Sequence, residues 1–350
     1  MKKISLIISV LIFVTSCVTE SNKKKVVKNE LASVKKQKTS HNKSKIGKTT
    51  YTDLVKRTHK FADNLDFDLN YIRKKGLKDK KYLAEFLGMY WKLKKALKSP
   101  DDVDKIQKRL EPFYKETLKP NFHNMATVND KLFKANSMSY MRIMWLLQEL
   151  GFDISLHKKE LAKVQKRMDN HMVKRGAWQR AVFDKYYDFF KIEKPVALND
   201  AKKLKGPIKT KQKINYYKRV EAYNITHFIF AAYDYGKKKS QSRFSKADID
   251  YLKDILPKII QKFELKNNDD LVGELLTCQI LIGDTKTEAF KKSYQRLMRR
   301  QNQDGSFGSY ERARKKYGKD LEFRYYMHTT LVCFEAFVEF EERKVSNIFE

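Results

Sequence analysis

Three segments of the chain carry polar residues at helical spacing within otherwise apolar runs. Tyr223, His227, Phe230 and Asp234 follow one another at intervals of four, three and four, Asp270, Glu274 and Cys278 at intervals of four, and His328 and Glu335 are seven apart. Residues at these intervals share one face of an α-helix. If the three faces meet, two imidazoles and several carboxylates converge, and the candidate pocket consists of His227, Asp234, Asp270, Glu274, His328 and Glu335.

Such a set of side chains supports two kinds of chemistry. His227, Glu274 and His328 could bind zinc or another divalent metal, because imidazole and carboxylate are common zinc ligands. Without a metal, His227 or His328 could act as a general acid or base. We expect no cofactor, and a divalent metal is the alternative.

Each residue also has a purely structural interpretation. His227 could be a hydrogen-bonded core histidine, and Asp270 could cap a helix that begins after Asn267 and Asn268. Glu274 is harder to explain, because a carboxylate buried without a partner in its apolar run would be costly. The other histidines lie in polar or lysine-rich settings and are predicted to be solvated: His41, His59, His123, His157 and His171.

The composition predicts that these residues lie on helices. The chain has only 12 glycines and 6 prolines among its 350 residues, and it is rich in good helix formers. Apolar periodicity predicts helices at 53–71, 80–98, 103–115, 128–150, 156–172, 178–190, 214–235, 246–263, 270–282, 285–300 and 321–343. No segment alternates strictly enough to predict a strand, so the predicted fold class is all-α.

The helices of the second half alternate in character. Those at 214–235, 270–282 and 321–343 are rich in apolar residues, which is typical of buried helices, whereas those at 246–263 and 285–300 carry a lysine-rich face. This alternation predicts an α/α toroid-like domain, an incomplete or closed ring of helical hairpins. The domain should cover residues 51–350, with N-terminal helices at 51–120 and hairpin repeats at 121–350. Cys278 and Cys333 lie in apolar helical patterns, so we expect two buried free thiols.

One turn supports the ring. Gln301, Asp304, Gly305 and Phe307 belong to the run Gln-Asn-Gln-Asp-Gly-Ser-Phe-Gly, in which Asp-Gly predicts a tight turn. The segment resembles the repeat of terpenoid cyclases and protein prenyltransferase β-subunits, which implies an α/α toroid. In the prenyltransferases a Tyr-His-Thr run like that around His328 supplies a zinc ligand. The chain lacks the Asp-x-Asp-Asp motif of the cyclases and the Asp-x-Cys pair of the prenyltransferases, so the resemblance carries the fold and not the activity.

The N-terminus has the pattern of an export signal. Two lysines precede an apolar run from Ile4 to Val14, which is too short for a permanent membrane span, and Thr15-Ser16-Cys17 follows. This ending resembles the lipobox of bacterial lipoproteins. The resemblance implies that residues 1–16 are a signal peptide and that Cys17 carries a diacylglycerol and an N-acyl chain. We therefore expect a lipid anchor in the bacterial cell envelope, on the outer or the cell membrane and facing the periplasm or the cell surface.

Residues 17–50 have the composition of a disordered tether, because they are rich in lysine, serine and asparagine and have no aromatic residue. The whole chain has a formal charge of +33. This charge favours an anionic glycan or lipid as partner, or it reflects a general lysine bias. The lysines are scattered and no DNA-binding motif accompanies them, so we do not expect nucleic acid as a partner.

The leading hypothesis is a lipid-anchored envelope protein with a binding or structural role and a central polar cavity. The first alternative is a polysaccharide-active or metal-dependent enzyme on the same fold. The second is an electrostatic binder of anionic lipid or glycan. The sequence carries no motif that names a substrate or an oligomeric state.

Overall fold

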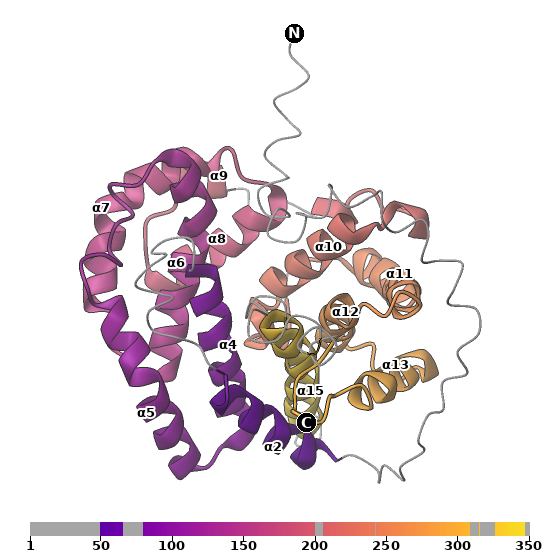
Figure 1. Cartoon of the computed structure of the whole chain (residues 1–350). Helices are drawn as coiled ribbons and strands as arrows, with labels where there is room; N and C mark the ends of the chain where they lie inside the picture. Colours follow the sequence, from indigo (N-terminus) through magenta and orange to yellow (C-terminus); the bar gives the residue numbers. More distant parts are fainter. Residues whose placement is uncertain are drawn as a thin grey trace, which may run out of the picture. The chain divides into compact units, whose positions relative to one another are not determined.

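The computed structural model describes residues 50–65, 80–199, 206–241, 243–308, 315 and 326–346. The chain divides into two units, residues 1–49 and 50–350, and all described residues belong to the second unit. The predicted signal peptide, Cys17 and most of the tether therefore lie outside the described residues. Within the described part the structure has twelve α-helices and no strand, which confirms the all-α prediction (Figure 1).

The helices follow the predicted order. The first group is α2 (Tyr51–Asp63), α4 (Lys80–Leu97), α5 (Pro100–Thr117), α6 (Asp130–Leu150), α7 (Ser155–Met172), α8 (Ala177–Phe190) and the short α9 (Val196–Asn199). The second group is α10 (Arg219–Ala232), α11 (Lys246–Glu264), α12 (Asp269–Leu281), α13 (Glu288–Met298) and α15 (Met327–Ser346). In the described part of the chain, three 3-10 turns lie between α9 and α11: η5 (Gly206–Ile208) and η6 (Ile214–Tyr216) before α10, and η7 (Asp234–Gly236) after it.

Local sequence explains where the helices begin and end. The side chain of Asn129 accepts a hydrogen bond from the backbone N–H of Leu132 at the start of α6, and Gly151 ends that helix with a φ of 97°. Ser245 and Asp248 form a reciprocal capping box at the start of α11. These signals are short-range, so they can be read from the sequence.

The prediction of one helix over 214–235 was wrong. The backbone carbonyls of Ile214 and Tyr217 accept hydrogen bonds from Nζ of Lys262 at 3.4 and 2.9 Å, so the chain is tied to α11 before α10 begins. At the other end, Asp234, Tyr235 and Gly236 all have positive φ, which turns the chain away from the helix axis.

Buried and amphipathic helices alternate along the chain. In α12 every residue except Asp270 is buried, whereas α13 buries only Phe290, Tyr294 and Leu297. The same contrast holds between α4, which is buried from Leu83 to Leu93, and α5, which buries one face. The apolar faces of the amphipathic helices therefore cover the buried ones.

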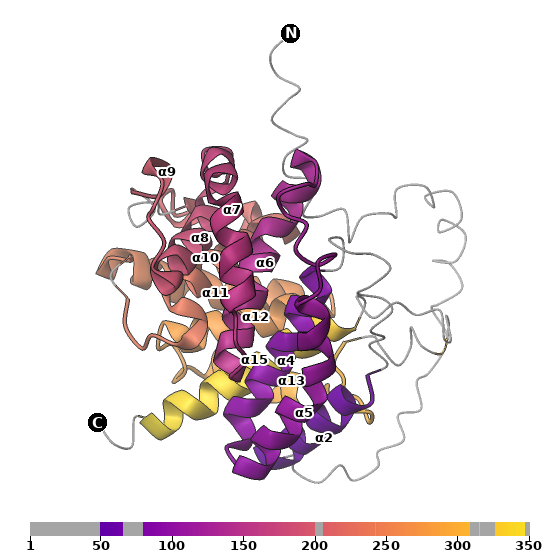
Figure 2. The same cartoon turned by 90° about the vertical axis from the view of Figure 1, so that its left-hand side faces the viewer.

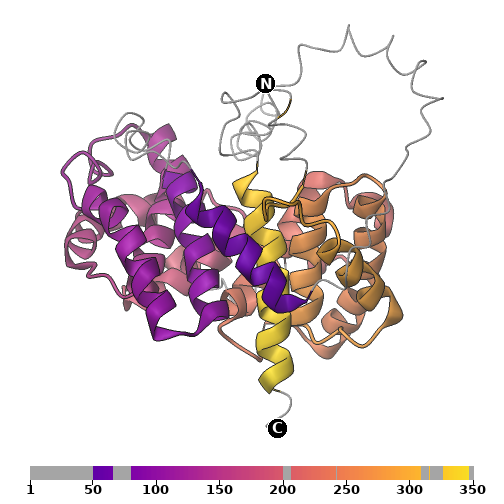
Figure 3. The same cartoon turned by 60° about the horizontal axis from the view of Figure 1, so that its bottom comes forward.

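The buried helices pack against one another in a fixed order. Helix α4 contacts α6 and α15, α8 contacts α6 and α10, and α12 contacts α10 and α15. Figure 2 shows α4, α5, α6 and α7 from the side of the first half, and Figure 3 shows α15, in yellow, between the two halves of the domain. The last helix thus contacts both an early and a late part of the chain.

Helices α12 and α15 approach each other closely at Gly273. A Cβ at this position would lie 2.9 Å from Cα of Cys333, so only glycine permits the contact. Cys278 and Cys333 are buried free cysteines, as expected. Among the described residues no helix has both the length and the apolarity that crossing a membrane requires.

The Gln301 segment packs on α2. Nε2 of Gln301 donates hydrogen bonds to the carbonyls of Leu54 and Gly305 and to the hydroxyl of Thr58. Oδ1 of Asp304 accepts hydrogen bonds from the backbone and the hydroxyl of Ser306, which closes the turn. Gly305 has a φ of 90°, and Phe307 is fully buried with its ring 5.8 Å from that of Phe337.

Candidate functional site

Three of the predicted pocket residues form a compact cluster. Nε2 of His328 lies 3.3 Å from Oδ1 of Asp270 and 3.6 Å from Oε1 of Glu274. One side-chain ligand atom from each of the three residues lies within 4.8 Å of the other two. We call Asp270, Glu274 and His328 the histidine–carboxylate cluster.

The start of two packed helices positions this cluster. Asp270 and Glu274 are one turn apart at the N-terminus of α12, and His328 is in the first turn of α15. Asn268, not Asp270, caps α12, because its side chain accepts a hydrogen bond from the N–H of Leu271. The carboxylate of Asp270 is therefore left for contacts away from its own helix.

Each member of the cluster is held on its outer side by another residue. The hydroxyl of Tyr223 donates to Oδ2 of Asp270 at 2.5 Å, and the hydroxyl of Thr226 donates to Oε2 of Glu274 at 2.5 Å. Nδ1 of His328 lies 3.3 Å from Oε1 of Glu85. In each of the three side chains, the outer atom makes a contact with a neighbouring residue. This contact orients the other ligand atom of the same side chain toward the centre of the cluster.

Glu85 and Thr226 were not among the predicted pocket residues. Glu85 lies in the apolar run Leu83-Ala84-Glu85-Phe86-Leu87 of α4 and has 2% of its surface exposed. A carboxylate in an apolar run is the same signal that singled out Glu274, so it could have found Glu85 as well. A threonine beside a histidine carries no such signal.

His227 lies next to the cluster but is bound differently. Its Nδ1 donates to the backbone carbonyl of Tyr223 at 2.8 Å and lies 3.8 Å from Oε2 of Glu274. Its ring lies 4.9 Å from that of Trp178. Burial lowers the pKa of His227, so the imidazole is neutral at neutral pH.

The charges of the cluster depend on one another. Burial opposes protonation of His328, but the carboxylates of Asp270, Glu85 and Glu274 raise its pKa well above the usual value. Burial also opposes ionisation of Glu85, yet Lys81 and His328 lower its pKa to about 2. At neutral pH His328 is therefore an imidazolium that bridges carboxylates.

The pKa values of the two carboxylates of α12 are shifted in opposite directions. Burial raises the pKa of Asp270, and the nearby charge of Glu274 raises it further. Burial works against Glu274 too, but His227 and His328 lower its pKa. The exposed fractions of the side chains of His328 and Asp270 are 28% and 16%, whereas that of Glu274 is 1%. Solvent therefore reaches the cluster from the side of His328 and Asp270.

The structure does not bring Asp234 and Glu335 into this cluster. Asp234 pairs with Nζ of Lys185 at 2.9 Å, and Glu335 pairs with Nζ of Lys92 at 2.9 Å. Both are partly or fully buried carboxylates that already have a lysine partner. Ion pairing explains why these two carboxylates are present in apolar surroundings. The cluster therefore contains fewer residues than the predicted pocket.

The prediction that five histidines are solvated was wrong for His157. This side chain is fully buried, and its Nε2 lies 3.0 Å from the hydroxyl of Thr117. The Thr117 hydroxyl donates to the carbonyl of Tyr114, so it accepts the proton of Nε2. His59, His123 and His171 are partly exposed, and His41 lies outside the described residues.

Comparison with protein-family models identifies a related family. A family model described as a domain of unknown function (DUF6895) matches residues 55–337. No curated protein and no solved structure matches the chain. The matched region begins in α2, ends in α15 and contains the histidine–carboxylate cluster with Glu85, Tyr223 and Thr226.

Proposed function

The chain belongs to the DUF6895 family, and from the geometry of the histidine–carboxylate cluster we propose that it binds a divalent metal ion through Asp270, Glu274 and His328. The outer contacts of these three residues carry the proposal. Metal-binding histidines commonly donate their other ring N–H to a carboxylate, and ligating carboxylates are themselves hydrogen-bonded. Glu85, Tyr223 and Thr226 occupy these supporting positions for His328, Asp270 and Glu274.

The donor set fits a divalent ion. One imidazole and two carboxylates suit zinc, and they also suit manganese or iron. Metal–ligand distances of about 2 Å bring ligand atoms to within about 4 Å of one another, and here the three atoms already lie within 4.8 Å. A cation would also relieve the repulsion between Asp270 and Glu274, which contributes to the raised pKa of Asp270.

We further propose that the helices form an α/α toroid. The order of contacts supports this arrangement, since α4, α6, α8, α10, α12 and α15 pack in succession and α15 packs on α4 again. The amphipathic helices α5, α7, α11 and α13 then form the outer layer. In such a ring the cluster lies at the N-terminal ends of α12 and α15.

Metal titration of the purified full-length protein in detergent tests the site. After treatment with a chelator, calorimetric titration with Zn²⁺ and separately with Mn²⁺ should show one site for at least one of the ions. Asp270→Asn, Glu274→Gln and His328→Gln should each abolish that site. Glu335→Gln is the matched control, because Glu335 is also buried but lies outside the cluster, and it should bind like the wild type. Absence of stoichiometric binding by the wild type would refute the proposal.

A second candidate function rests on His227. This neutral imidazole is 29% exposed and adjoins Glu274, so it could accept a proton from a substrate without a metal. An acidic polysaccharide would be the substrate class that suits the basic chain. Cleavage of alginate or polygalacturonate that persists in excess chelator and is lost in His227→Gln would favour this enzyme over the metal-binding protein.

We propose that the protein is anchored to the cell envelope by lipid on Cys17, as the lipobox-like sequence suggests. Cys17→Ser removes the only thiol at the expected cleavage site. The variant should therefore move from the membrane fraction to the soluble fraction or accumulate as precursor. An unchanged membrane fraction would contradict lipidation.

A further inference from the structure

Arg142 carries a positive charge that no described carboxylate neutralises in an ion pair. It lies near the middle of α6, and among the residues that the structure describes it makes no hydrogen bond and no ion pair. Its side chain is only partly exposed. Because withdrawing a charge from bulk water without a partner is unfavourable, packing alone does not explain an arginine at this position.

The guanidinium of Arg142 lies at the contact between α4 and α15. A Cβ at Gly88 would be 3.4 Å from Nη2 of Arg142 and 3.5 Å from Cδ2 of Leu331. Gly88 follows Glu85 by three residues on α4. Leu331 follows His328 by three residues on α15. Since Glu85 contacts His328, the guanidinium lies beside the helix contact that also holds the imidazole of the cluster.

The charge of Arg142 acts on residues of the candidate site. Burial raises the pKa of Glu85 and lowers that of His227, and the positive charge of Arg142 lowers both. Burial also opposes the charge of Arg142 itself, whereas nearby tyrosine and carboxylate groups, Glu335 among them, raise its pKa. Arg142 is therefore a guanidinium cation within electrostatic reach of the histidine–carboxylate cluster.

The carboxylates near Arg142 have other cationic partners. Glu335 pairs with Nζ of Lys92 at 2.9 Å, and Oε1 of Glu85 lies 3.3 Å from Nδ1 of His328. These contacts match the negative charges without the guanidinium. The N–H donors of Arg142 are thus left for an anion that is not part of the described chain.

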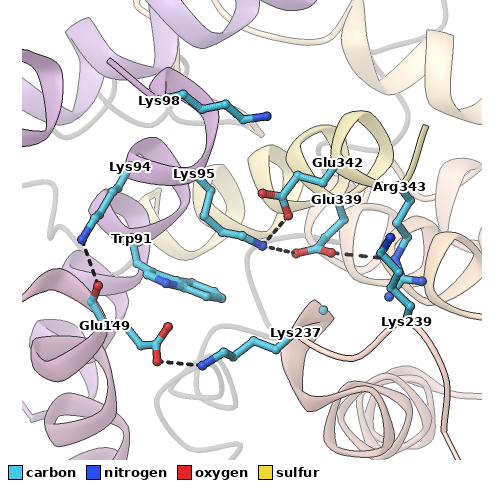
Figure 4. A pocket seen from close by; sticks show the side chains of 11 residues that line it. Trp91, Lys94, Lys95, Lys98, Glu149, Lys237, Lys239, Glu339, Glu342 and Arg343 are labelled. Atoms are coloured by element: carbon cyan, nitrogen blue, oxygen red, sulfur yellow. Dashed lines mark hydrogen bonds and ion pairs between the residues drawn. The ribbon is translucent and has the colours of Figure 1, made fainter. Parts of the chain in front are cut away.

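Three of the lysines that line a cavity of about 680 Å³ beside α4 differ in this respect (Figure 4). Nζ of Lys94 donates to the carbonyl of Glu149 at 3.0 Å, and Nζ of Lys237 pairs with the carboxylate of Glu149 at 2.7 Å. Lys95 pairs with Glu342 at 2.5 Å. Protein groups already engage these cations, so we assign no ligand to that cavity.

A row of aromatic rings connects Arg142 with His227. The ring of Tyr235 lies 5.9 Å from Cζ of Arg142 and 5.9 Å from the ring of Phe230. The ring of Phe230 lies 6.1 Å from that of His227, which in turn lies 4.9 Å from that of Trp178. Arg142, Tyr235 and His227 all keep accessible surface. Solvent therefore reaches both ends of the row.

These neighbours define the chemistry of a ligand. The planar guanidinium suits a carboxylate, which it can bind through two parallel hydrogen bonds. A dianionic phosphate ester suits this position less well, because the charges of Glu85 and Glu335 act on the same place. Aromatic rings pack on the CH groups of a sugar, and a neutral imidazole or a metal ion binds its hydroxyl oxygens.

We propose that Arg142 binds the carboxylate of a sugar acid whose hydroxyl groups lie toward His227 and the histidine–carboxylate cluster. The contact with the cluster rests on the proposed metal site, whereas the contact of the carboxylate with Arg142 does not. The two contacts can therefore be tested separately.

Calorimetric titration of the metal-free full-length protein in detergent with D-glucuronate tests the contact with Arg142. D-glucuronate should bind saturably, and D-glucose and D-glucose 6-phosphate should bind at least about tenfold more weakly. Arg142→Gln should weaken glucuronate binding about tenfold or more, whereas Arg142→Lys, which keeps the charge but not the planar fork, should weaken it less. Arg299→Gln is the control, because Arg299 is exposed at the end of α13.

Labelling of the wild type with phenylglyoxal gives a readout that needs no variant. The reagent modifies accessible arginines, and peptide mass spectrometry locates the product. Glucuronate should protect Arg142 and leave Arg299 reactive, and glucose should protect neither. Equal labelling of Arg142 with and without glucuronate would contradict the proposal.

Repetition of the titration after loading with Zn²⁺ or Mn²⁺ tests the contact with the cluster. A bound metal should raise the affinity for glucuronate, and an affinity that a bound metal leaves unchanged would overturn this contact. If no metal binds, the metal-free titration still decides the role of Arg142. Equal affinity of Arg142→Gln and the wild type, equally tight binding of glucose 6-phosphate, or no binding of glucuronate would overturn the proposal.

Discussion

The hydroxyl of Tyr223 donates a hydrogen bond to Oδ2 of Asp270, while Oδ1 of the same carboxylate faces Nε2 of His328 at 3.3 Å. The two carboxylate oxygens of Asp270 thus differ in role. Oδ2 is fixed by the hydrogen bond from α10, and Oδ1 faces the other members of the cluster. Such contacts lower the freedom of a ligand group before any ion binds.

Tyr223→Phe should therefore weaken metal binding without removing a ligand. Loss of an outer partner of this kind lowers metal affinity by about 10- to 100-fold. Zinc and manganese titrations of Tyr223→Phe and the wild type measure the effect. Tyr216→Phe is the control, because Tyr216 is exposed on η6 and should leave the affinity unchanged.

Metal affinity should rise with pH. The pKa of His328 is well above its usual value, so a metal must displace a proton from its imidazolium, and affinity should increase up to about tenfold per pH unit below that pKa. Titrations at pH 6, 7 and 8 in buffers of different ionisation enthalpy would measure both the affinity and the proton release. Affinity that does not change with pH would place His328 outside the metal site.

The same imidazolium affects the stability of the metal-free protein. Because the folded pKa of His328 exceeds the unfolded value of about 6.5, its contribution is fully present below pH 6.5 and is lost as the pH rises through the folded pKa. Urea denaturation of the chelator-treated wild type and of His328→Gln, from pH 6.5 upward, should show that the variant loses less stability. Parallel pH profiles would contradict this assignment.

His157 should make the folded protein less stable as the pH is lowered, whereas His328 makes it less stable as the pH is raised. Burial lowers its pKa to about 4, so between pH 6.5 and pH 4 the unfolded chain binds a proton that the folded protein does not. Stability should fall by up to about 3 kcal/mol across this window. His157→Gln, whose amide can still reach Thr117, should show a shallower pH dependence in urea denaturation.

Gly236 lies against the carboxylate of Glu339. A Cβ at Gly236 would be 2.3 Å from both carboxylate oxygens, and Gly236 has a φ of 91°. Gly236→Ala should cost more than Gly283→Ala, which also has positive φ but has no atom within 4 Å of the added Cβ. The control should lose about 1–2 kcal/mol of unfolding free energy and Gly236→Ala clearly more. Equal losses would mean that Glu339 moves aside freely.

Local patterns in the sequence predicted most helices well. The helix predicted at 128–150 is α6 at Asp130–Leu150, because its cap at Asn129 and its stop at Gly151 are both local signals. Glu274 stood out for an equally local reason, since its neighbours are apolar. The boundaries of α6 and the importance of Glu274 could therefore be predicted without knowledge of the rest of the fold.

The sequence predictions failed for residues whose environment depends on contacts with other helices. His157 is followed by two lysines, so the segment looked solvated, but its own helical face continues to Leu161 and Val164 and is buried. Glu85 reaches His328 only because α4 packs on α15. Asp234 and Glu335 have lysine partners on other helices, and such pairing is invisible in a single sequence.

The contact of Gln301 with Thr58 joins residues 243 positions apart, and the late helix α15 packs on the early helix α4. During synthesis the apolar faces of α4 and α12 therefore lack their partner until the C-terminal helix appears. A product that ends before residue 327 would retain that exposed surface, and cellular proteases would have access to it. Packing of α15 therefore controls how much apolar surface of the domain proteases can reach.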